Sequence, residues 1–174
     1  MSNVEIRNSA SADRDAIEAL YPDAFPDEDL LPLVRELLRD PADCLSLVAS
    51  VDSRIAGHIV FTRCGVEGSR TDVSLLAPLA VAPDCQRQGV GSALVHHGIR
   101  RLVADHTQMV FVLGDPAYYG RFGFAPESQV EPPYPLPDDW QSAWQSLLLN
   151  QNGARPAGTL RVPAPWMQPA LWAA

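Results

Sequence analysis

The chain has 174 residues and contains no lysine, so all 13 of its basic residues are arginine. A phosphate loop of the nucleoside-triphosphatase type needs a lysine after its second glycine, and the sequence therefore excludes that class. Acidic residues outnumber basic ones, and the formal net charge is −8. Because such a field repels phosphates on average, the charge argues against a nucleic-acid partner.

Cysteine is scarce as well. The three cysteines, Cys44, Cys64 and Cys85, are too few and too scattered for a disulfide framework or a zinc site, so we expect no metal and reduced thiols. No apolar run approaches the roughly 20 residues that span a bilayer. The N-terminus lacks the basic and apolar regions of a signal peptide. We therefore expect a cytoplasmic protein with no membrane partner.

The overall composition is that of a globular protein, with 47% hydrophobic and 20% charged residues. A chain of this length can bury a substantial core as one domain. We expect a single domain over residues 1–174, with its core at about residues 3–126. The proline-rich residues 127–174 then form a C-terminal extension that completes the fold.

Hydrophobic periodicity predicts helices and strands in mixed order. The expected strands cover 4–7, 45–51, 55–63, 72–81, 109–113, 122–125 and 159–162. The expected helices are one from about residue 11 that Pro22 and Pro26 break, one over 27–39, one over 89–103, a short one over 116–121 and one over 140–149. A strand, helix and strand over 72–113 imply a parallel pair with a right-handed crossover.

The most informative segment is Gln86–Gly91, which follows the apolar run Leu75–Val81. It predicts a strand that feeds a glycine-bearing turn, which in turn opens a helix. In that arrangement the N–H groups at the helix N-terminus hold an anion, and Gly89 and Gly91 carry no Cβ atom to keep a phosphate away. A dinucleotide-binding fingerprint is excluded, because Leu94 stands where its third glycine belongs.

A second informative segment is Tyr119–Phe124, which reads Tyr-Gly-Arg-Phe-Gly-Phe. A phenol is fully protonated near neutral pH and can donate a proton to a leaving group. The other interpretation is that Tyr118 and Tyr119 only pack a helix against the sheet.

Together, the Gln-x-x-Gly-x-Gly and Tyr-x-x-x-Gly-Phe patterns resemble the GNAT N-acetyltransferase superfamily. They lie in the right order and about 30 residues apart, which suits one βαβ unit. The segment Gly114–Tyr119 and the proline-rich tail resemble the YhbS-like branch. The resemblance implies an α/β fold with a twisted mixed sheet of about six to seven strands, including a splayed parallel pair, flanked by helices.

The resemblance also implies a function. It implies an N-acetyltransferase that moves the acetyl group of acetyl-CoA to a primary amine by direct attack in a ternary complex, without a metal. Tyr119 is then the catalytic acid, and Tyr118 is the tyrosine that packs. The backbone of Leu79, Ala80 and Val81 pairs with the pantetheine arm, and the Val81 N–H polarises the acetyl carbonyl. The backbone N–H groups of Arg87, Gln88, Gly89, Val90, Gly91 and Ser92 are implied to surround the pyrophosphate, and Gln86 is implied to brace this cofactor-binding loop.

The sequence departs from the family pattern at one place and leaves the proton acceptor open. Many members carry an asparagine that touches the pantetheine arm where Gly114–Asp115 stands here, so the resemblance does not extend to that contact. No general base stands out. Asp72, Ser74, His58 and Glu67 are candidates, and each has a bland reading as a structural or solvated residue. For Arg87 a phosphate contact and a solvated surface charge fit equally well.

The acceptor also stays open between a small amine, a peptide N-terminus and a protein lysine. The segments Tyr21–Leu31 and Glu131–Trp144 are expected to shape its pocket, and their acidic residues suit a cationic amine. Trp166, Met167 and Trp172 either cover the core or form a homodimer contact. The alternative function is a non-catalytic acyl-CoA sensor that keeps the loop and turns nothing over.

Overall fold

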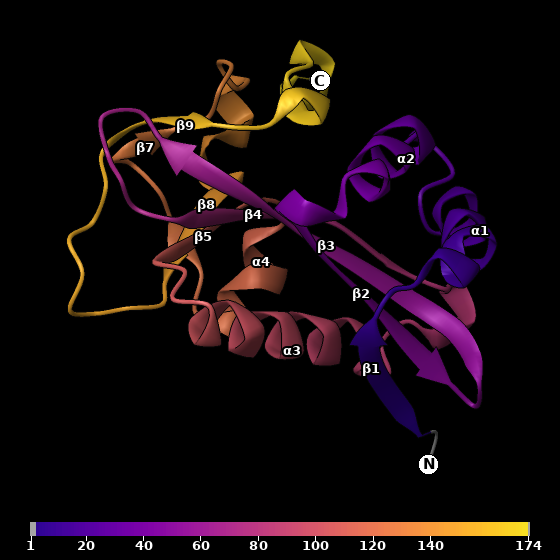
Figure 1. Ribbon diagram of the computed structural model, residues 1–174. Coiled ribbons are helices and arrows are strands. Elements are labelled where there is room, and N and C mark those ends of the chain that lie inside the picture. Colours follow the sequence, from indigo (N-terminus) through magenta and orange to yellow (C-terminus); the bar gives the residue numbers. More distant parts are fainter. Residues whose placement is uncertain (1–2, 174) are drawn as a thin grey trace. The chain divides into compact units, whose positions relative to one another are not determined.

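A computed structural model describes residues 3–173 (Figure 1). The chain divides into two compact units. Unit 1 comprises Met1–Phe61 and Ala77–Arg101, and unit 2 comprises Thr62–Leu76 and Leu102–Ala174. Two long strands, β3 (Arg54–Val66) and β4 (Val73–Val81), contribute to both units. The single domain over residues 1–174 stays a prediction.

Unit 1 is built on strands that hydrogen-bond in the order β1-β2-β3-β4. The first pair, β1 (Val4–Asn8) and β2 (Cys44–Val51), is antiparallel. Between these two strands the chain forms α1 (Arg14–Ala24) and α2 (Leu31–Arg39), and after β4 it forms α3 (Val90–Ala104). In α2 the apolar residues recur with helical spacing, and Leu33, Val34 and Leu37 are buried.

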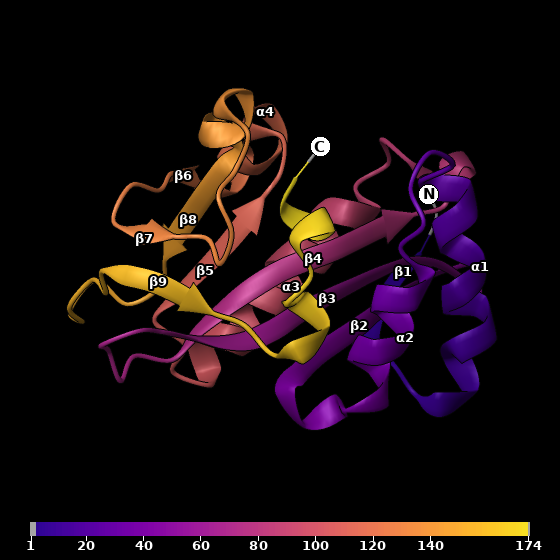
Figure 2. The same ribbon diagram turned by 90° about the horizontal axis from the view of Figure 1, so that it is seen from above.

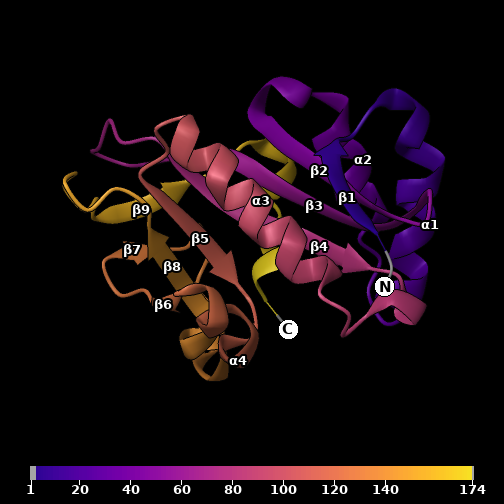
Figure 3. The same ribbon diagram turned by 90° about the horizontal axis from the view of Figure 1, so that it is seen from below.

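The helices of unit 1 cover opposite faces of β3. A Cβ atom on Gly57 would lie 2.9 Å from a Leu94 carbon of α3, so residue 57 faces that helix. Figure 3 shows α3 on this side of β3. The next residue, His58, is hydrogen-bonded to Tyr21 of α1. Since successive side chains of a strand point to opposite faces, α1 and α3 lie on opposite sides of the strand (Figure 1).

Unit 2 contains the remaining strands (Figure 2). They are β5 (Met109–Leu113), β6 (Ala125–Pro126), β7 (Val130–Glu131), β8 (Trp144–Leu148) and β9 (Gly158–Arg161), with the short helix α4 (Pro116–Tyr119) after β5. The order here is β4-β5-β8-β6, and β9 pairs with β3 and β7. The β4–β5 pairing is parallel over Val73–Leu75 and Met109–Phe111, whereas β5–β8 is antiparallel. A mixed α/β fold with a parallel pair, flanked by helices, is therefore confirmed.

The helix predicted over 140–149 is wrong. Trp144 to Leu148 form β8, and a 3-10 helix precedes them at Asp138–Ala143. The four-residue spacing of Trp140 and Trp144 fits a helix, but β5 offers an open edge that takes the segment as a strand. Trp144 is then buried, stacks on Phe111 at 5.5 Å between ring centroids, and donates its indole N–H to Val130 O at 2.7 Å.

Two helix boundaries also differ from the expectation. Helix α1 continues through Pro22 to Ala24, because a proline this close to the C-terminus costs only one hydrogen bond of the last turn. Helix α2 begins at Leu31 and not near Asp27, so the acidic residues 27–29 belong to the connection between the two helices. This connection forms the pocket described below.

The aromatic residues of the C-terminal segment pack within unit 2. Trp166 and Trp172 are 5% and 2% exposed. The indole N–H of Trp166 donates to Thr62 Oγ1 at 3.1 Å, and that of Trp172 donates to Trp166 O at 3.0 Å. These two residues therefore cover the core, while Met167 is 50% exposed. Across residues 3–173 no helix combines the length and apolar character that a membrane crossing needs.

Candidate functional site

The turn between β4 and α3 has the geometry expected of an anion-binding loop. After Ala82 the chain makes a 3-10 turn at Pro83–Cys85, and α3 begins at Val90. Arg87 and Gly89 have φ values of 60° and 86°, the left-handed region that turns successive N–H groups toward one side. No atom lies within 4 Å of the position that a Cβ on Gly89 would occupy. The backbone is therefore open to a ligand there.

Side chains of the loop and of β3 hold this turn in place. Gln86 Nε2 donates to Val81 O at 3.1 Å, and Gln88 Nε2 donates to Asp84 O at 3.0 Å. Arg54 Nη2, at the start of β3, donates to Asp84 Oδ2 at 2.9 Å and to Cys85 Sγ at 3.1 Å. The sequence contains no signal for the Arg54 contact, because some 30 residues separate the partners.

The N-terminus of α3 supplies the polarity that an anion needs. The Ala93 N–H donates to Gly89 O at 3.0 Å, which is the first rung of the helix. The N–H groups before it have no partner along the helix, and the helix dipole places positive charge at this end. The Arg87 side chain is exposed and forms no ion pair within residues 3–173. It is available to a phosphate or to solvent, as expected from the sequence.

Unit 2 carries Tyr119, the last residue of α4. Asp115 caps this helix by accepting the Ala117 N–H at 2.9 Å, and Pro116 follows at the first helical position. The Tyr119 ring packs against Phe124 at 5.7 Å between centroids. Its hydroxyl forms no hydrogen bond with any described residue, and burial raises the pKa of this phenol above its ordinary value. Tyr119 therefore stays protonated at neutral pH.

The neighbouring Tyr118 has different partners. The Arg121 guanidinium lies over its ring at 4.6 Å from the centroid, and Phe122 packs edge-on at 5.4 Å. A cation over the ring face and a ring edge beside it are both favourable packing contacts. Tyr118 thus forms a small cluster with Arg121 and Phe122, as expected of a tyrosine that packs.

Gly114 explains the departure from the family pattern. A Cβ atom at this position would overlap Cε2 of Tyr119, so the ring lies directly against the backbone. That backbone is held on both sides, because the Gly114 N–H donates to Ala143 O at 3.0 Å and Gln145 Nε2 donates to Gly114 O at 3.0 Å. An asparagine at 114 is therefore incompatible with this position of Tyr119.

None of the four candidate bases has surroundings that indicate catalysis. His58 is fully buried and hydrogen-bonded through both ring nitrogens, and burial lowers its pKa to about 3. Asp72 pairs with Arg63 at 3.2 Å, and Ser74 Oγ donates to Thr62 O at 3.2 Å. Glu67 is exposed. The interpretation of these four as structural or solvated residues therefore fits their surroundings.

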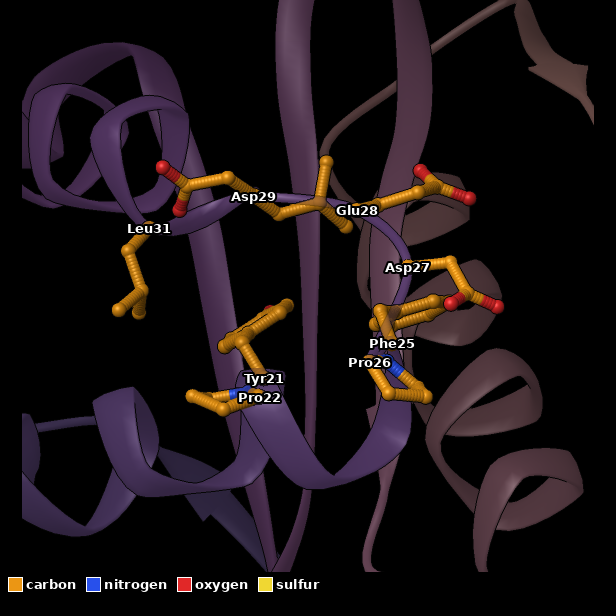
Figure 4. Close-up of a pocket in the computed structure, with 9 residues that line it drawn as sticks. Tyr21, Pro22, Phe25, Pro26, Asp27, Glu28, Asp29 and Leu31 are labelled. Atoms are coloured by element: carbon orange, nitrogen blue, oxygen red, sulfur yellow. The ribbon is translucent and has the colours of Figure 1, made fainter.

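A pocket of about 320 Å³ lies at the connection of α1 and α2 in unit 1 (Figure 4). Its aromatic residues are Tyr21 and Phe25, whose rings stack with centroids 6.2 Å apart. The lining residues are Tyr21, Pro22, Phe25, Pro26, Asp27, Glu28, Asp29, Leu30 and Leu31. The predicted segment Tyr21–Leu31 therefore lines a pocket within unit 1.

The sequence and the fold match known acetyltransferases. Residues 14–124 match the acetyltransferase (GNAT) family. The chain is 37% identical over 140 residues to the uncharacterized N-acetyltransferase YjhQ of Escherichia coli K12, covering 76% of this chain and 77% of that protein. It is 35% identical over 120 residues to YhbS, another uncharacterized N-acetyltransferase of that strain, covering 68% and 72%.

Solved structures agree. The chain superposes on E. coli YhbS in complex with CoA with a TM-score of 0.86 at 29% identity, covering 97% of this chain and 94% of that one. A GNAT family acetyltransferase from Brucella melitensis in complex with acetyl-CoA gives 0.76 at 26% identity, covering 94% and 97%. The chain therefore belongs to the acetyltransferase (GNAT) family and is an acyltransferase. The resemblance predicted from the loop and the Tyr119 motif is confirmed.

The contact between Gly114 and Tyr119 predicts a stability effect. Gly114→Ala is expected to lower the free energy of unfolding by about 1–3 kcal/mol, the usual cost of overpacking. In a Tyr119→Ala background the same substitution should cost less than about 0.5 kcal/mol, because the overlapping ring is gone. Urea denaturation of the four proteins measures this coupling. Gly120→Ala, where a Cβ meets nothing within 4 Å, is the control. Equal costs in both backgrounds would contradict the contact.

Proposed function

We propose that the protein transfers the acetyl group of acetyl-CoA to a primary amine by direct attack in a ternary complex. The observation that carries the proposal is the braced turn Gln86–Gly89 at the open N-terminus of α3. Helix N-termini with exposed N–H groups bind phosphate, and acetyl-CoA carries a pyrophosphate. The N–H groups of residues 87–92 then surround that group, with Arg87 as a charged contact and Gln86 as the brace of the loop. The relatives that bind CoA and acetyl-CoA support the choice of donor.

The pantetheine arm is assigned to the end of β4. The parallel register of this strand covers only Val73–Leu75, so the backbone of Leu79, Ala80 and Val81 lies outside it. The Ala82 N–H donates to Ala56 O of β3 at 2.8 Å. Because N–H groups alternate sides along a strand, that of Val81 points away from β3. It can therefore polarise the acetyl carbonyl, while the arm pairs as an added strand.

In the reaction, the amine nitrogen bonds to the acetyl carbon while the carbon–sulfur bond breaks. The amine loses one proton to water, since no described side chain is proposed as the base. The departing thiolate takes a proton from the Tyr119 hydroxyl, and solvent returns that proton to the phenolate. Holding both reactants in one complex supplies much of the rate. Tyr119 suits the role because its hydroxyl is protonated and has no hydrogen-bond partner among the described residues.

The acceptor is proposed to be a cationic amine bound at the pocket between α1 and α2. Phe25, which is partly exposed, provides aromatic surface for its apolar body, and the buried Tyr21 ring stacks against Phe25. Asp27, Glu28 and Asp29 lie on the connection that lines this pocket (Figure 4), and none of them forms an ion pair within the part of the chain that the structure describes. Unpaired carboxylates attract the protonated, cationic form of the amine. The ammonium group then loses a proton, and the neutral amine reacts.

The donor assignment is tested by Gly91→Glu, which should abolish acetyl-CoA binding. The new carboxylate repels the pyrophosphate and fills the space beside it. Isothermal titration calorimetry measures the binding. Val103→Glu adds the same charge at a half-exposed position near the other end of α3, and it should bind acetyl-CoA as the unmodified protein does. If the unmodified, folded protein does not bind acetyl-CoA, the proposed function is wrong.

The catalytic role is tested by Tyr119→Phe. We expect kcat to fall by about 10²–10⁴-fold, the range for loss of a general acid, with the dissociation constant of acetyl-CoA unchanged within about twofold. Tyr118→Phe is the matched control and should keep its turnover. If the protein is a sensor that only binds acyl-CoA, neither the unmodified protein nor the two variants will show turnover. Full activity of Tyr119→Phe would remove Tyr119 from the mechanism.

The acceptor site is tested by neutralising its carboxylates in the triple variant Asp27→Asn, Glu28→Gln and Asp29→Asn. The KM for a cationic amine should rise about 3–10-fold, and the difference should shrink as salt screens the charges. The control neutralises three exposed charges outside both predicted pocket segments, with Glu5→Gln, Asp52→Asn and Asp105→Asn. An equal rise of KM in both variants would show that only net charge matters, which contradicts a site at residues 27–29.

A further inference from the structure

A chain of hydrogen bonds in unit 1 ends at the wall of the pocket. Ser9 Oγ donates to Ser46 Oγ at 2.7 Å, and Ser46 Oγ lies 2.9 Å from His58 Nε2. His58 Nδ1 lies 2.6 Å from the Tyr21 hydroxyl. The hydrogen bonds thus link the residue after β1, β2 and β3 to the last turn of α1, and Tyr21, the final member, lines the pocket.

One arrangement of protons gives every buried donor and acceptor in this series of hydrogen bonds a partner. Tyr21 is 1% exposed, and the structure gives its hydroxyl no other partner, so it must donate to Nδ1 of His58. A neutral imidazole carries one proton, which then sits on Nε2 and is donated to Ser46 Oγ. Burial keeps His58 neutral by lowering its pKa. His58 Nδ1 therefore accepts the hydrogen bond of the Tyr21 hydroxyl and does not change protonation state at neutral pH.

The hydroxyl contact is what fixes the Tyr21 ring. Pro22 follows directly and has no N–H group, so the end of α1 lacks one backbone hydrogen bond. The Tyr21 ring stacks on Phe25 with an interplanar angle of 19° and meets the His58 ring edge-on at 5.8 Å. The hydrogen bond to Nδ1 therefore fixes the hydroxyl end of the Tyr21 ring, while the two ring contacts hold its face and its edge.

We propose that His58 is a positioning residue for the acceptor: it holds the Tyr21 ring as a wall of the pocket between α1 and α2. This inference rests on the proposed function, in which that pocket binds the amine. His58 itself touches neither acceptor nor donor. Its effect is therefore on the affinity for the amine, and the chemical step and the affinity for acetyl-CoA stay as they are.

Two substitutions separate the nitrogens of His58. The amide of asparagine can replace Nδ1, so His58→Asn keeps an acceptor for Tyr21. The amide of glutamine reaches the position of Nε2, so His58→Gln keeps the Ser46 contact and loses that to Tyr21. We expect His58→Gln to raise the KM for the amine about fivefold or more, the effect of losing one buried hydrogen bond. We expect the KM of His58→Asn to lie close to that of the unmodified protein, because the hydrogen bond to Tyr21 is kept. In both variants kcat and acetyl-CoA affinity should change less than about twofold.

Equal KM values for the two variants, or parallel losses of kcat and acetyl-CoA affinity, would overturn the proposal, since a merely structural histidine predicts them. If His58→Gln does not fold, Tyr21→Phe takes its place. It removes only the hydroxyl, and an unchanged KM there would also overturn the proposal.

A second readout does not depend on activity. Fluorine NMR of protein labelled with fluorotyrosine, with Tyr21→Phe to assign the signal, should show a fixed Tyr21 ring in the unmodified protein and in His58→Asn. In His58→Gln the ring should be mobile. If no amine is acetylated, the proposed function fails and this spectrum alone decides the role of His58. Identical Tyr21 signals in all three proteins would then contradict it.

Discussion

The close approach of α3 to β3 is the constraint on which the rest of unit 1 depends. The absence of a side chain at Gly57 lets Leu94 and Val90 of the helix lie against the strand, and Gly98 admits the Phe61 ring in the same way. These contacts fix the direction of α3 relative to the end of β4. Its first N–H groups therefore meet the turn that Gln86 and Arg54 hold in place.

The same strand serves the other face of unit 1. The strand alternation that turns Gly57 and Phe61 toward α3 turns His58 toward α1. One strand thus positions both the proposed donor loop at the N-terminus of α3 and, through Tyr21, the wall of the pocket between α1 and α2. A buried histidine that looks like a catalytic base is, in this arrangement, a neutral hydrogen-bond acceptor.

Unit 2 contributes the proposed acid by similar means. Asp115 starts α4, and the bare backbone of Gly114 leaves room for the Tyr119 ring. The backbone of Gly114, where many family members carry an asparagine, lies directly against the Tyr119 ring. The chain thus keeps the tyrosine of the family motif and has a glycine where many members carry an asparagine.

The sequence alone was sufficient for the parts of the protein whose signals are local. Strand, turn and helix around Gln86–Gly91, the tyrosine motif at Tyr119 and the strand Met109–Leu113 all depend on neighbours within a few residues, where spacing and glycine placement carry the information. The family followed from two such motifs.

Tertiary structure decided the rest. Trp144–Leu148 became a strand because β5 offered an edge, and α2 began four residues later than expected, which left Asp27–Leu30 to form a pocket. The contacts Arg54–Cys85 and His58–Tyr21 join side chains that are 31 and 37 residues apart and that no local pattern relates. Such contacts depend on which strand faces lie opposite which helices, and that depends on the packing of the whole unit.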